Sequence, residues 1–92
     1  MKPLDLSEPF RVRVRDYPKE MRGKIGSMLQ RLEQDFGHPH RHRGLGIRKL
    51  TGSFFEIRVG KDIRLIFQNR AECLLFVMAG NHDEAQRFLR GL

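Results

Sequence analysis

The sequence predicts an α+β fold: a small twisted antiparallel sheet of about four strands, a helix from the N-terminal half on one face, and a short C-terminal helix. Three observations support this class. Apolar and polar residues alternate in several short segments, apolar residues recur at helical spacing between residues 21 and 36, and turn residues separate these segments. Ninety-two residues are enough for one modest core, so we expect a single domain over residues 1–92.

The first predicted strand is the segment PFRVRVR, in which Phe10, Val12 and Val14 alternate with arginines. The residues Asp-Tyr-Pro at 16–18 end this strand and open a helix, because proline is tolerated in a first helical turn. Gly37 is expected to end the helix. Its apolar stripe consists of Met21, Ile25, Met28, Leu29, Leu32 and Phe36.

The second half of the chain is predicted to form a meander of strands and a closing helix. A short extended piece, LGIRKL, precedes the segments FFEIRVG and DIRLIFQ, which Gly60, Lys61 and Asp62 join into a hairpin. The next segment, CLLFVMA, is apolar on both faces and should be a central strand. The last segment, HDEAQRFLRGL, is predicted to form the short C-terminal helix.

The composition indicates an anionic partner. Eighteen Lys and Arg against eleven Asp and Glu give a net charge of +7, which favours nucleic acid, an acidic protein or, less readily, a membrane surface. The lone cysteine, Cys73, excludes an intrachain disulfide and fits a reducing cytoplasm. The N-terminus lacks the apolar stretch of a signal peptide, and the run from Cys73 to Ala79 is too short to span a bilayer. We therefore expect a cytoplasmic protein with no membrane partner.

Two arginines are predicted to face each other across the hairpin. If its loop has three residues, Val59 pairs with Ile63 and Arg58 lies directly opposite Arg64, an unfavourable arrangement of like charges. Either both arginines extend into water or pair with acids such as Glu56, next along the same face, or they form a cradle for an anion. The second interpretation rests on the match between guanidinium and phosphate geometry.

His82 follows the last strand, at the end of the sheet where the meander also brings Arg58 and Arg64. Histidine titrates near neutrality, as a general acid or base should, so this position suggests a catalytic site. The alternative is a structural residue beside a helix cap, which Asn81 or Asp83 could provide without it.

The basic segment HPHRHRG, residues 38–44, allows three interpretations. It could be a solvated loop, a metal site built on its three histidines or, as we favour, part of a basic rim that follows a nucleic-acid backbone. Neither cysteine nor clustered acids accompany the histidines, and structural zinc sites usually have four ligands, so metal binding is the weakest of the three. The residues predicted to bind RNA are Arg41, Arg43, Arg48, Lys49 and Lys61.

The stretch LTGSFFEIRVGKDIRLIF, followed by LLFVMAGNHDEA, resembles the bacterial RelE/ParE toxin superfamily. In that family a Leu-x-Gly turn precedes a strand with an arginine, then a hairpin and an Arg-Leu-Ile strand, and the final strand ends in Gly-x-His. The resemblance covers residues 43–86 and implies a small twisted antiparallel sheet with helices packed on one face. It also implies a toxin, since many members are ribosome-dependent messenger-RNA endonucleases that promote attack of the ribose 2′-hydroxyl on the adjacent phosphate without a metal ion.

The resemblance implies a role for each candidate catalytic residue. Arg64 corresponds to the arginine that stabilises the scissile phosphate, Arg58 to a basic residue on the neighbouring strand, and His82 to a histidine that some members use as acid or base. Glu56 is included in the candidate catalytic set, but its role is open because other members carry lysine or another polar residue there.

The chain also departs from the family pattern. Asp83, Gln86 and Phe88 occupy the region where many active members have a tyrosine or another aromatic residue, and the first helical segment looks shorter than the usual two-helix hairpin. Two alternatives keep the fold without the chemistry: a ParE-like toxin that binds DNA gyrase, and a non-toxic basic module that binds nucleic acid. We favour the endoribonuclease because Arg58, Arg64 and His82 occur together in this sequence. Its expected partners are an acidic antitoxin, messenger RNA and the ribosome, with no cofactor or metal ion.

Overall fold

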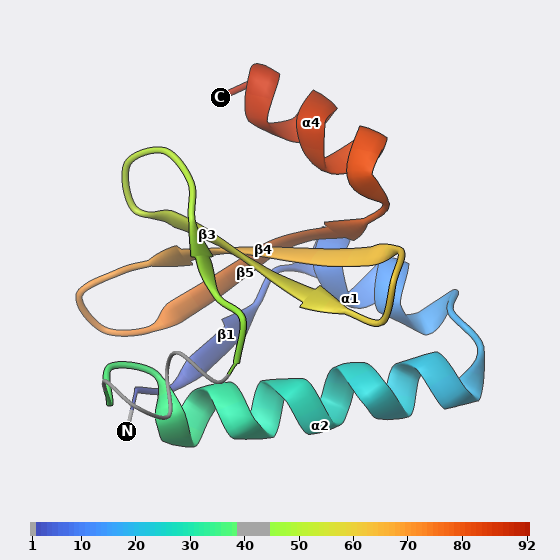
Figure 1. Cartoon of the computed structure of the whole chain (residues 1–92), viewed down its shortest axis with the longest axis horizontal. Coiled ribbons are helices and arrows are strands. Elements are labelled where there is room, and N and C mark those ends of the chain that lie inside the picture. Colours follow the sequence, from blue (N-terminus) through green and yellow to red (C-terminus); the bar gives the residue numbers. More distant parts are fainter. Residues whose placement is uncertain (1, 39–44) are drawn as a thin grey trace.

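The computed structural model describes residues 2–38 and 45–92, and this part of the chain contains three helices and a five-stranded mixed sheet (Figure 1). The helices are α1 (Glu8–Arg15), α2 (Lys19–Asp35) and α4 (His82–Arg90), and the strands are β1 (Leu4–Leu6), β2 (Arg48–Lys49), β3 (Phe54–Val59), β4 (Ile63–Asn69) and β5 (Leu74–Gly80). The strand order is β1-β5-β4-β3-β2, with β1 parallel to β5 and the other neighbours antiparallel. The predicted α+β class is confirmed, with one strand more than expected.

The segment predicted as the first strand is a helix, so that prediction is wrong. α1 begins after Ser7, whose hydroxyl accepts a hydrogen bond from the Phe10 N–H (3.3 Å), and Pro9 lies in its first turn. The apolar alternation is short, and Phe10 and Val14 are also one helical turn apart. In the helix Phe10 is buried, whereas Val12, which a strand would have turned inward, is 46% exposed.

The first strand is instead β1, which lies just before α1. It pairs in parallel with β5, so that Leu4 is opposite Leu74 and Leu6 is opposite Phe76. No local pattern predicts this pairing, because it joins residues from opposite ends of the chain. With β1 on one side and β4 on the other, β5 is an inner strand, as its apolar sequence predicted.

The two helices that precede the hairpin also remove one departure from the family pattern. α2 begins after Pro18 and ends at Asp35, and Gly37 follows with a positive φ of 89°. The predicted helix is therefore present. Because α1 precedes it, the region contains two helices and not one.

The core lies between the sheet and the helices α1 and α2. Phe10 of α1 and Ile25 and Leu32 of α2 are almost fully buried against the inward side chains of β3, β4 and β5. The Phe10 ring contacts the Phe76 ring, and Phe76 in turn contacts Phe67, with ring centroids 5.3 and 5.0 Å apart. Each large apolar side chain buried in this way contributes roughly 1.5–3 kcal/mol.

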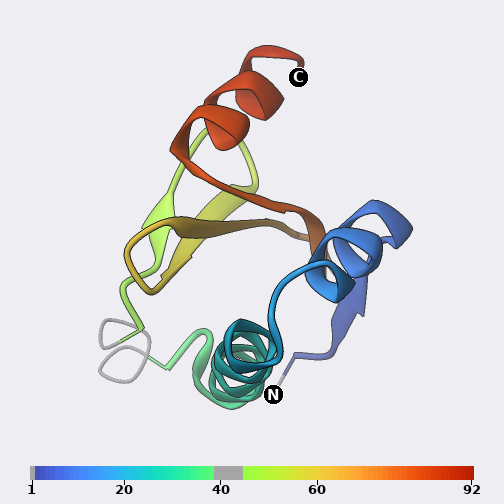
Figure 2. The same ribbon diagram turned by 90° about the vertical axis from the view of Figure 1, so that its right-hand side faces the viewer.

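The last helix lies on the other side of the sheet from α2 (Figure 1, Figure 2). It packs there through Phe88, whose ring meets that of Phe54 edge to face at a centroid distance of 6.4 Å. The sheet is thus covered by α1 and α2 on one face and partly by α4 on the other. None of the helices in the described ranges combines the length and apolar character that crossing a bilayer requires.

The β3–β4 hairpin has the predicted register. Val59 is opposite Ile63 and Arg58 is opposite Arg64. Gly60, the first residue of the three-residue loop, has a φ of 65°, a conformation that glycine adopts without strain. This register turns Arg58 and Arg64 to the sheet face that α4 partly covers, away from the core.

Candidate functional site

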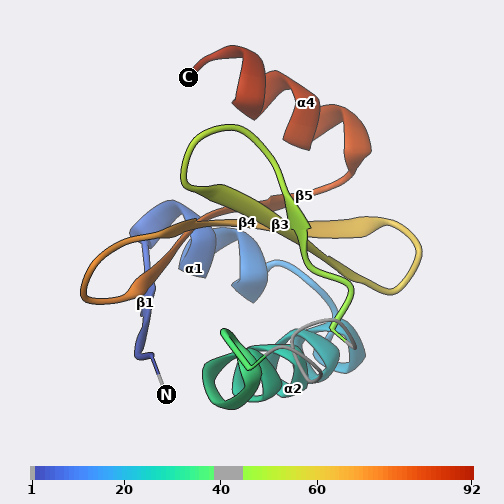
Figure 3. The same cartoon turned by 60° about the vertical axis from the view of Figure 1, so that its left-hand side comes forward.

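A hollow of about 480 Å³ opens where the hairpin loop meets the first turn of α4. These two segments lie side by side in all three overall views (Figure 1, Figure 2, Figure 3). The residues that line this space, which we name the Arg64–His82 hollow, are Lys61, Asp62, Arg64, Asn81, His82 and Asp83. Side chains from two distant parts of the sequence therefore meet at one opening.

The register of the last two strands explains this meeting. Arg64 is opposite Gly80 in the β4–β5 ladder, and Asn81 and His82 follow Gly80 directly. His82 is the first residue of α4, and its side chain is exposed. His82, two residues after Gly80, therefore lies beside Arg64 at the end of β5.

Arg64 is held by a buried carboxylate. Its Nη1 lies 3.4 Å from both carboxylate oxygens of Glu56, and the side chains of Arg64 and Glu56 are only 12% and 6% exposed. The Arg64 Nε is also buried and has no hydrogen-bond partner among the described residues. Glu56 is buried beside Arg64 and does not line the Arg64–His82 hollow.

The other predicted residues on the sheet are distributed over both faces. Arg58 is exposed and opposite Arg64, but it does not line the hollow. Arg48 of β2 is opposite Glu56, so it extends the charged row on the same face. Lys49 is exposed and opposite Phe55, which places it on the core side of the sheet.

A capping box fixes the first turn of α4. The Asn81 side chain accepts a hydrogen bond from the Glu84 N–H (2.8 Å), and the Glu84 carboxylate accepts one from the Asn81 N–H (3.0 Å). The other carboxylate oxygen of Glu84 forms an ion pair with Arg13 of α1. The Asn81 N–H first, and the Arg13 guanidinium with it, hold the pKa of the Glu84 carboxyl below its usual value. His82 is therefore attached to a helix that is anchored at its N-terminus.

The Arg64–His82 hollow combines cations with groups that can transfer protons. Arg64 and Lys61 can bind an anion such as a phosphate, and His82, Asp62 and Asp83 have the chemistry of a general acid or base. Asp62 did not stand out in the sequence as more than a turn residue, although its place in the loop before Arg64 is the signal that could have found it.

Part of the predicted basic rim lies outside the described residues. This applies to Arg41 and Arg43, and also to His40 and His42 of the possible metal site, while His38 is described and exposed. Within residues 2–38 and 45–92, no three His, Cys, Asp or Glu side chains are grouped so that they could hold a metal ion.

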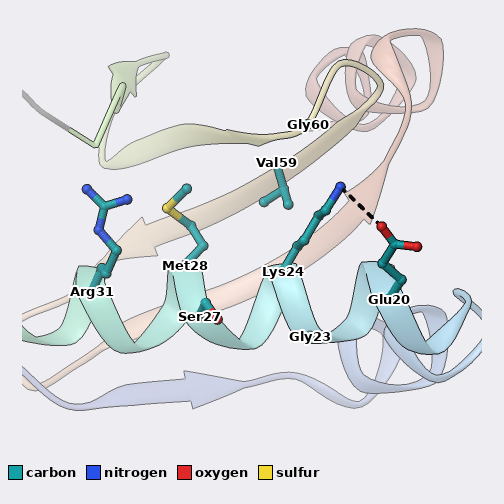
Figure 4. A pocket seen from close by; sticks show the side chains of 8 residues that line it. All are labelled: Glu20, Gly23, Lys24, Ser27, Met28, Arg31, Val59 and Gly60. Carbon is teal, nitrogen blue, oxygen red and sulfur yellow. Dashed lines mark ion pairs between the residues drawn. The ribbon is translucent and has the colours of Figure 1, made fainter.

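A second hollow, of about 580 Å³, lies between α2 and the hairpin (Figure 4). Figure 4 shows Lys24 pointing from α2 toward Glu20, with which it forms an ion pair of 3.9 Å. Gly23 and Arg31 also line this hollow. It has no histidine, and its one carboxylate, that of Glu20, is paired with Lys24, so this hollow is a weaker candidate for chemistry.

The chain is similar to several solved structures along most of its length. A chain of the RelB-RelE antitoxin-toxin complex from Methanococcus jannaschii matches with a TM-score of 0.70 and 15% identity, over 91% of this chain and 96% of that one. YafQ from E. coli strain BL21(DE3) matches with a TM-score of 0.71 and 17% identity, over 92% and 98%. The isolated E. coli RelE toxin matches with a TM-score of 0.65 and 18% identity over both whole chains. No family model and no curated protein matches the sequence.

Proposed function

We propose that this chain, which has the fold of the RelE/ParE toxins, is the toxin of a toxin–antitoxin pair and cleaves messenger RNA without a metal ion. The observation that carries the proposal is the meeting of Arg64 and His82 at one open hollow. The resemblance of residues 43–86 to the family's strand and histidine motifs supports it independently. On this proposal residues 1–92 form a single toxin domain that acts in the cytoplasm.

The reaction is a displacement at phosphorus within one RNA strand. The ribose 2′-oxygen bonds to the adjacent phosphorus, the bond from phosphorus to the 5′-oxygen breaks, and a 2′,3′-cyclic phosphate and a 5′-hydroxyl result. A base removes the proton of the 2′-hydroxyl, and an acid protonates the leaving 5′-oxygen. Negative charge builds up on the phosphoryl oxygens between these events, and a fixed cation there lowers the barrier.

Arg64 is suited to stabilise that phosphoryl charge, because Glu56 holds its guanidinium in place at the edge of the hollow. His82 is suited to one of the two proton transfers, since its exposed ring belongs to an anchored helix turn. Asp62 and Asp83 are the candidates for the other transfer. Glu56 is a positioning residue in this scheme and does not touch RNA.

The remaining basic residues would bind the RNA backbone beside the reacting phosphate. Lys61 lines the hollow itself, and Arg58 and Arg48 continue along the same face of the sheet. Arg41, Arg43 and Lys49 would contribute to non-specific binding, which should weaken steeply as salt is added. The same positive charge favours an acidic antitoxin as the protein partner and the messenger RNA on a ribosome as the substrate.

Induced expression followed by mapping of cellular RNA ends tests the proposal. We expect growth arrest and new 5′-hydroxyl ends at recurring positions within codons, and neither effect with His82→Gln. Growth arrest with a DNA-damage response and intact messages would instead identify a ParE-like toxin. Absence of both effects, with RNA binding retained, would identify a basic binding module.

A further inference from the structure

Arg13 is the residue through which α1 reaches α4. A hollow of about 530 Å³ lies between the two helices, and both Arg13 and Glu84 line it. Among the ion pairs formed between described residues, that of Arg13 with Glu84 is the one that joins α4 to another element. Because open space separates the helices, this ion pair is their direct connection.

The Glu84 carboxylate is held from two sides. Its Oε1 accepts a hydrogen bond from the Asn81 N–H (3.0 Å), and its Oε2 pairs with Nη2 of Arg13, so the carboxylate has a fixed orientation. The side chain also lies directly against Gly80, where a Cβ would be 3.1 Å from the Glu84 Cδ. Glu84 therefore holds the backbone of residues 80 and 81, which His82 follows.

The position of His82 depends on that backbone turn. His82 is the first residue of α4, and its side chain is exposed, so burial does not fix the imidazole ring. The turn places the ring beside Arg64, which is opposite Gly80 in the sheet. A displacement of about 1 Å between reacting groups can lower a rate about 100-fold. A small movement of this turn is therefore sufficient to impair proton transfer.

Arg13 is itself well placed to hold Glu84. It belongs to α1, which the buried Phe10 ring attaches to Phe76 of β5 at a centroid distance of 5.3 Å. Burial raises the pKa of the Tyr17 phenol and the Arg13 guanidinium opposes that rise, which indicates that these two side chains interact. The side chains of Arg13 and Glu84 are 44% and 23% exposed, and ion pairs of this kind contribute little to global stability. The pair is better suited to local orientation.

We propose that Arg13 is a positioning residue for His82. It does not line the Arg64–His82 hollow and acts through Glu84 and the Asn81 N–H. This inference rests on the proposed function and extends its machinery to α1, which contributes no side chain to the hollow. The alternative role is that of an ordinary surface ion pair, which would affect stability slightly and leave the chemistry unchanged.

Single-turnover cleavage of ribosome–message complexes tests the assignment. Arg13→Ala should lower the maximal rate about 10- to 100-fold, because His82 is misplaced. The toxin concentration that gives half the maximal rate should not change, since Arg13 takes no part in RNA binding. Arg13→Lys should recover most of the rate, because a lysine can still pair with Glu84.

Arg11→Ala is the matched control for Arg13→Ala. Arg11 lies on the same helix, and its replacement removes the same charge, but it forms no ion pair with a described residue. This variant should cleave at the wild-type rate. Circular dichroism should show that both variants are folded at the temperature of the assay.

A double-mutant cycle tests the route through Glu84. Glu84→Gln keeps the capping hydrogen bonds, because glutamine also serves in a capping box, but it removes the charge that Arg13 binds. It should slow cleavage, and Arg13→Ala added to it should slow cleavage no further. An equal additional loss in the double variant would show that Arg13 acts by another route. Glu84→Gln also provides the test if Arg13→Ala does not fold.

Nuclear magnetic resonance of the His82 ring gives a readout that does not require cleavage. The His82 signal is assigned by its absence from His82→Gln. Arg13→Ala should shift and broaden this signal and speed amide exchange at residues 81–84, whereas Arg11→Ala should change neither. If the wild type does not cleave RNA, the proposed function fails, but this comparison still decides whether Arg13 positions His82.

Three results would overturn the assignment. The first is an unchanged His82 signal and an unchanged cleavage rate in Arg13→Ala. The second is an equal loss of rate in Arg13→Ala and Arg11→Ala, which would mean that only the positive charge matters. The third is a rise in the half-saturating concentration with no fall in the maximal rate, which would make Arg13 an RNA-binding residue.

Discussion

The side chain of Glu84 lies so close to Gly80 that a methyl group on residue 80 would be 2.9 Å from its Oε1 and 3.0 Å from its Cβ. Because Glu84 completes the capping box of α4, residue 80 must have no side chain for the box to form. The same glycine is opposite Arg64 in the sheet, so the contact connects the two halves of the candidate site.

Gly80→Ala should therefore destabilise the protein by about 1–2 kcal/mol, the usual cost of a lost helix cap. The measurement is urea denaturation, with Gly23→Ala as the matched control. A Cβ at residue 23 meets nothing within 4 Å, so that variant should gain about 0.5–1 kcal/mol. Equal stability of the two variants would show that the contact at Gly80 relaxes without cost.

Acid should weaken the fold through Glu84. The pKa of this carboxyl is lower in the folded chain than its ordinary value of 4.5, chiefly through the Asn81 N–H and then through Arg13. The stabilisation is therefore present above about pH 4.5 and is lost as the pH falls through the lower folded pKa. Glu84→Gln should reduce stability at pH 7 and flatten the decline between pH 5 and pH 3, measured as urea midpoints. Parallel pH profiles for the variant and the wild type would contradict this assignment.

Arg64 should be important for stability as well as for cleavage. The opposed arginines alone predict a gain in stability for Arg64→Ala, because a repulsion is relieved. The structure reverses this expectation, since the buried Glu56 carboxylate would lose its ion-pair partner. We expect a loss of about 3 kcal/mol, part of which the double variant Arg64→Ala, Glu56→Ala should recover.

Arg58→Ala is the matched control for that experiment, because Arg58 is opposite Arg64 but exposed. It should leave stability unchanged or slightly raised. Additive losses from Arg64→Ala and Glu56→Ala in a double-mutant cycle would mean that the pair seen in the structure contributes nothing.

His82→Gln should separate chemistry from structure. Glutamine can still form a hydrogen bond but cannot transfer a proton, so the rate of RNA cleavage should fall by about 100- to 10,000-fold. Stability and RNA binding should change little, because the side chain is exposed and Asn81 provides the cap. Cleavage kinetics on purified ribosome–message complexes, together with filter binding, measure both. A variant that cleaves at the wild-type rate would exclude His82 as acid or base.

The sequence predicted best where structure is local. The Gly60 turn and the alternation on either side fixed the hairpin register, and with it the opposition of Arg58 and Arg64. The sequence predicted least well the elements whose formation depends on contacts between residues far apart in the chain. β1 exists only through its pairing with β5, and α1 was hidden because three alternating residues fit both a strand and a helix. The sequence alone does not decide whether Arg64 pairs with Glu56 or binds an external anion. Alternation places Arg64 and Glu56 on one face of the sheet, but it does not orient their side chains.

The pairing of Leu4–Leu6 with Leu74–Phe76 has a consequence for the order of events during synthesis. β1 can pair only after β5 has been synthesised, and most of the described residues lie between the two strands. Contacts of such large sequence separation close late and slow folding. Neither β1 nor the Arg64–His82 hollow can be complete before β5 has emerged. A newly made chain therefore contains α1 and α2 before it has a closed sheet or a complete Arg64–His82 hollow.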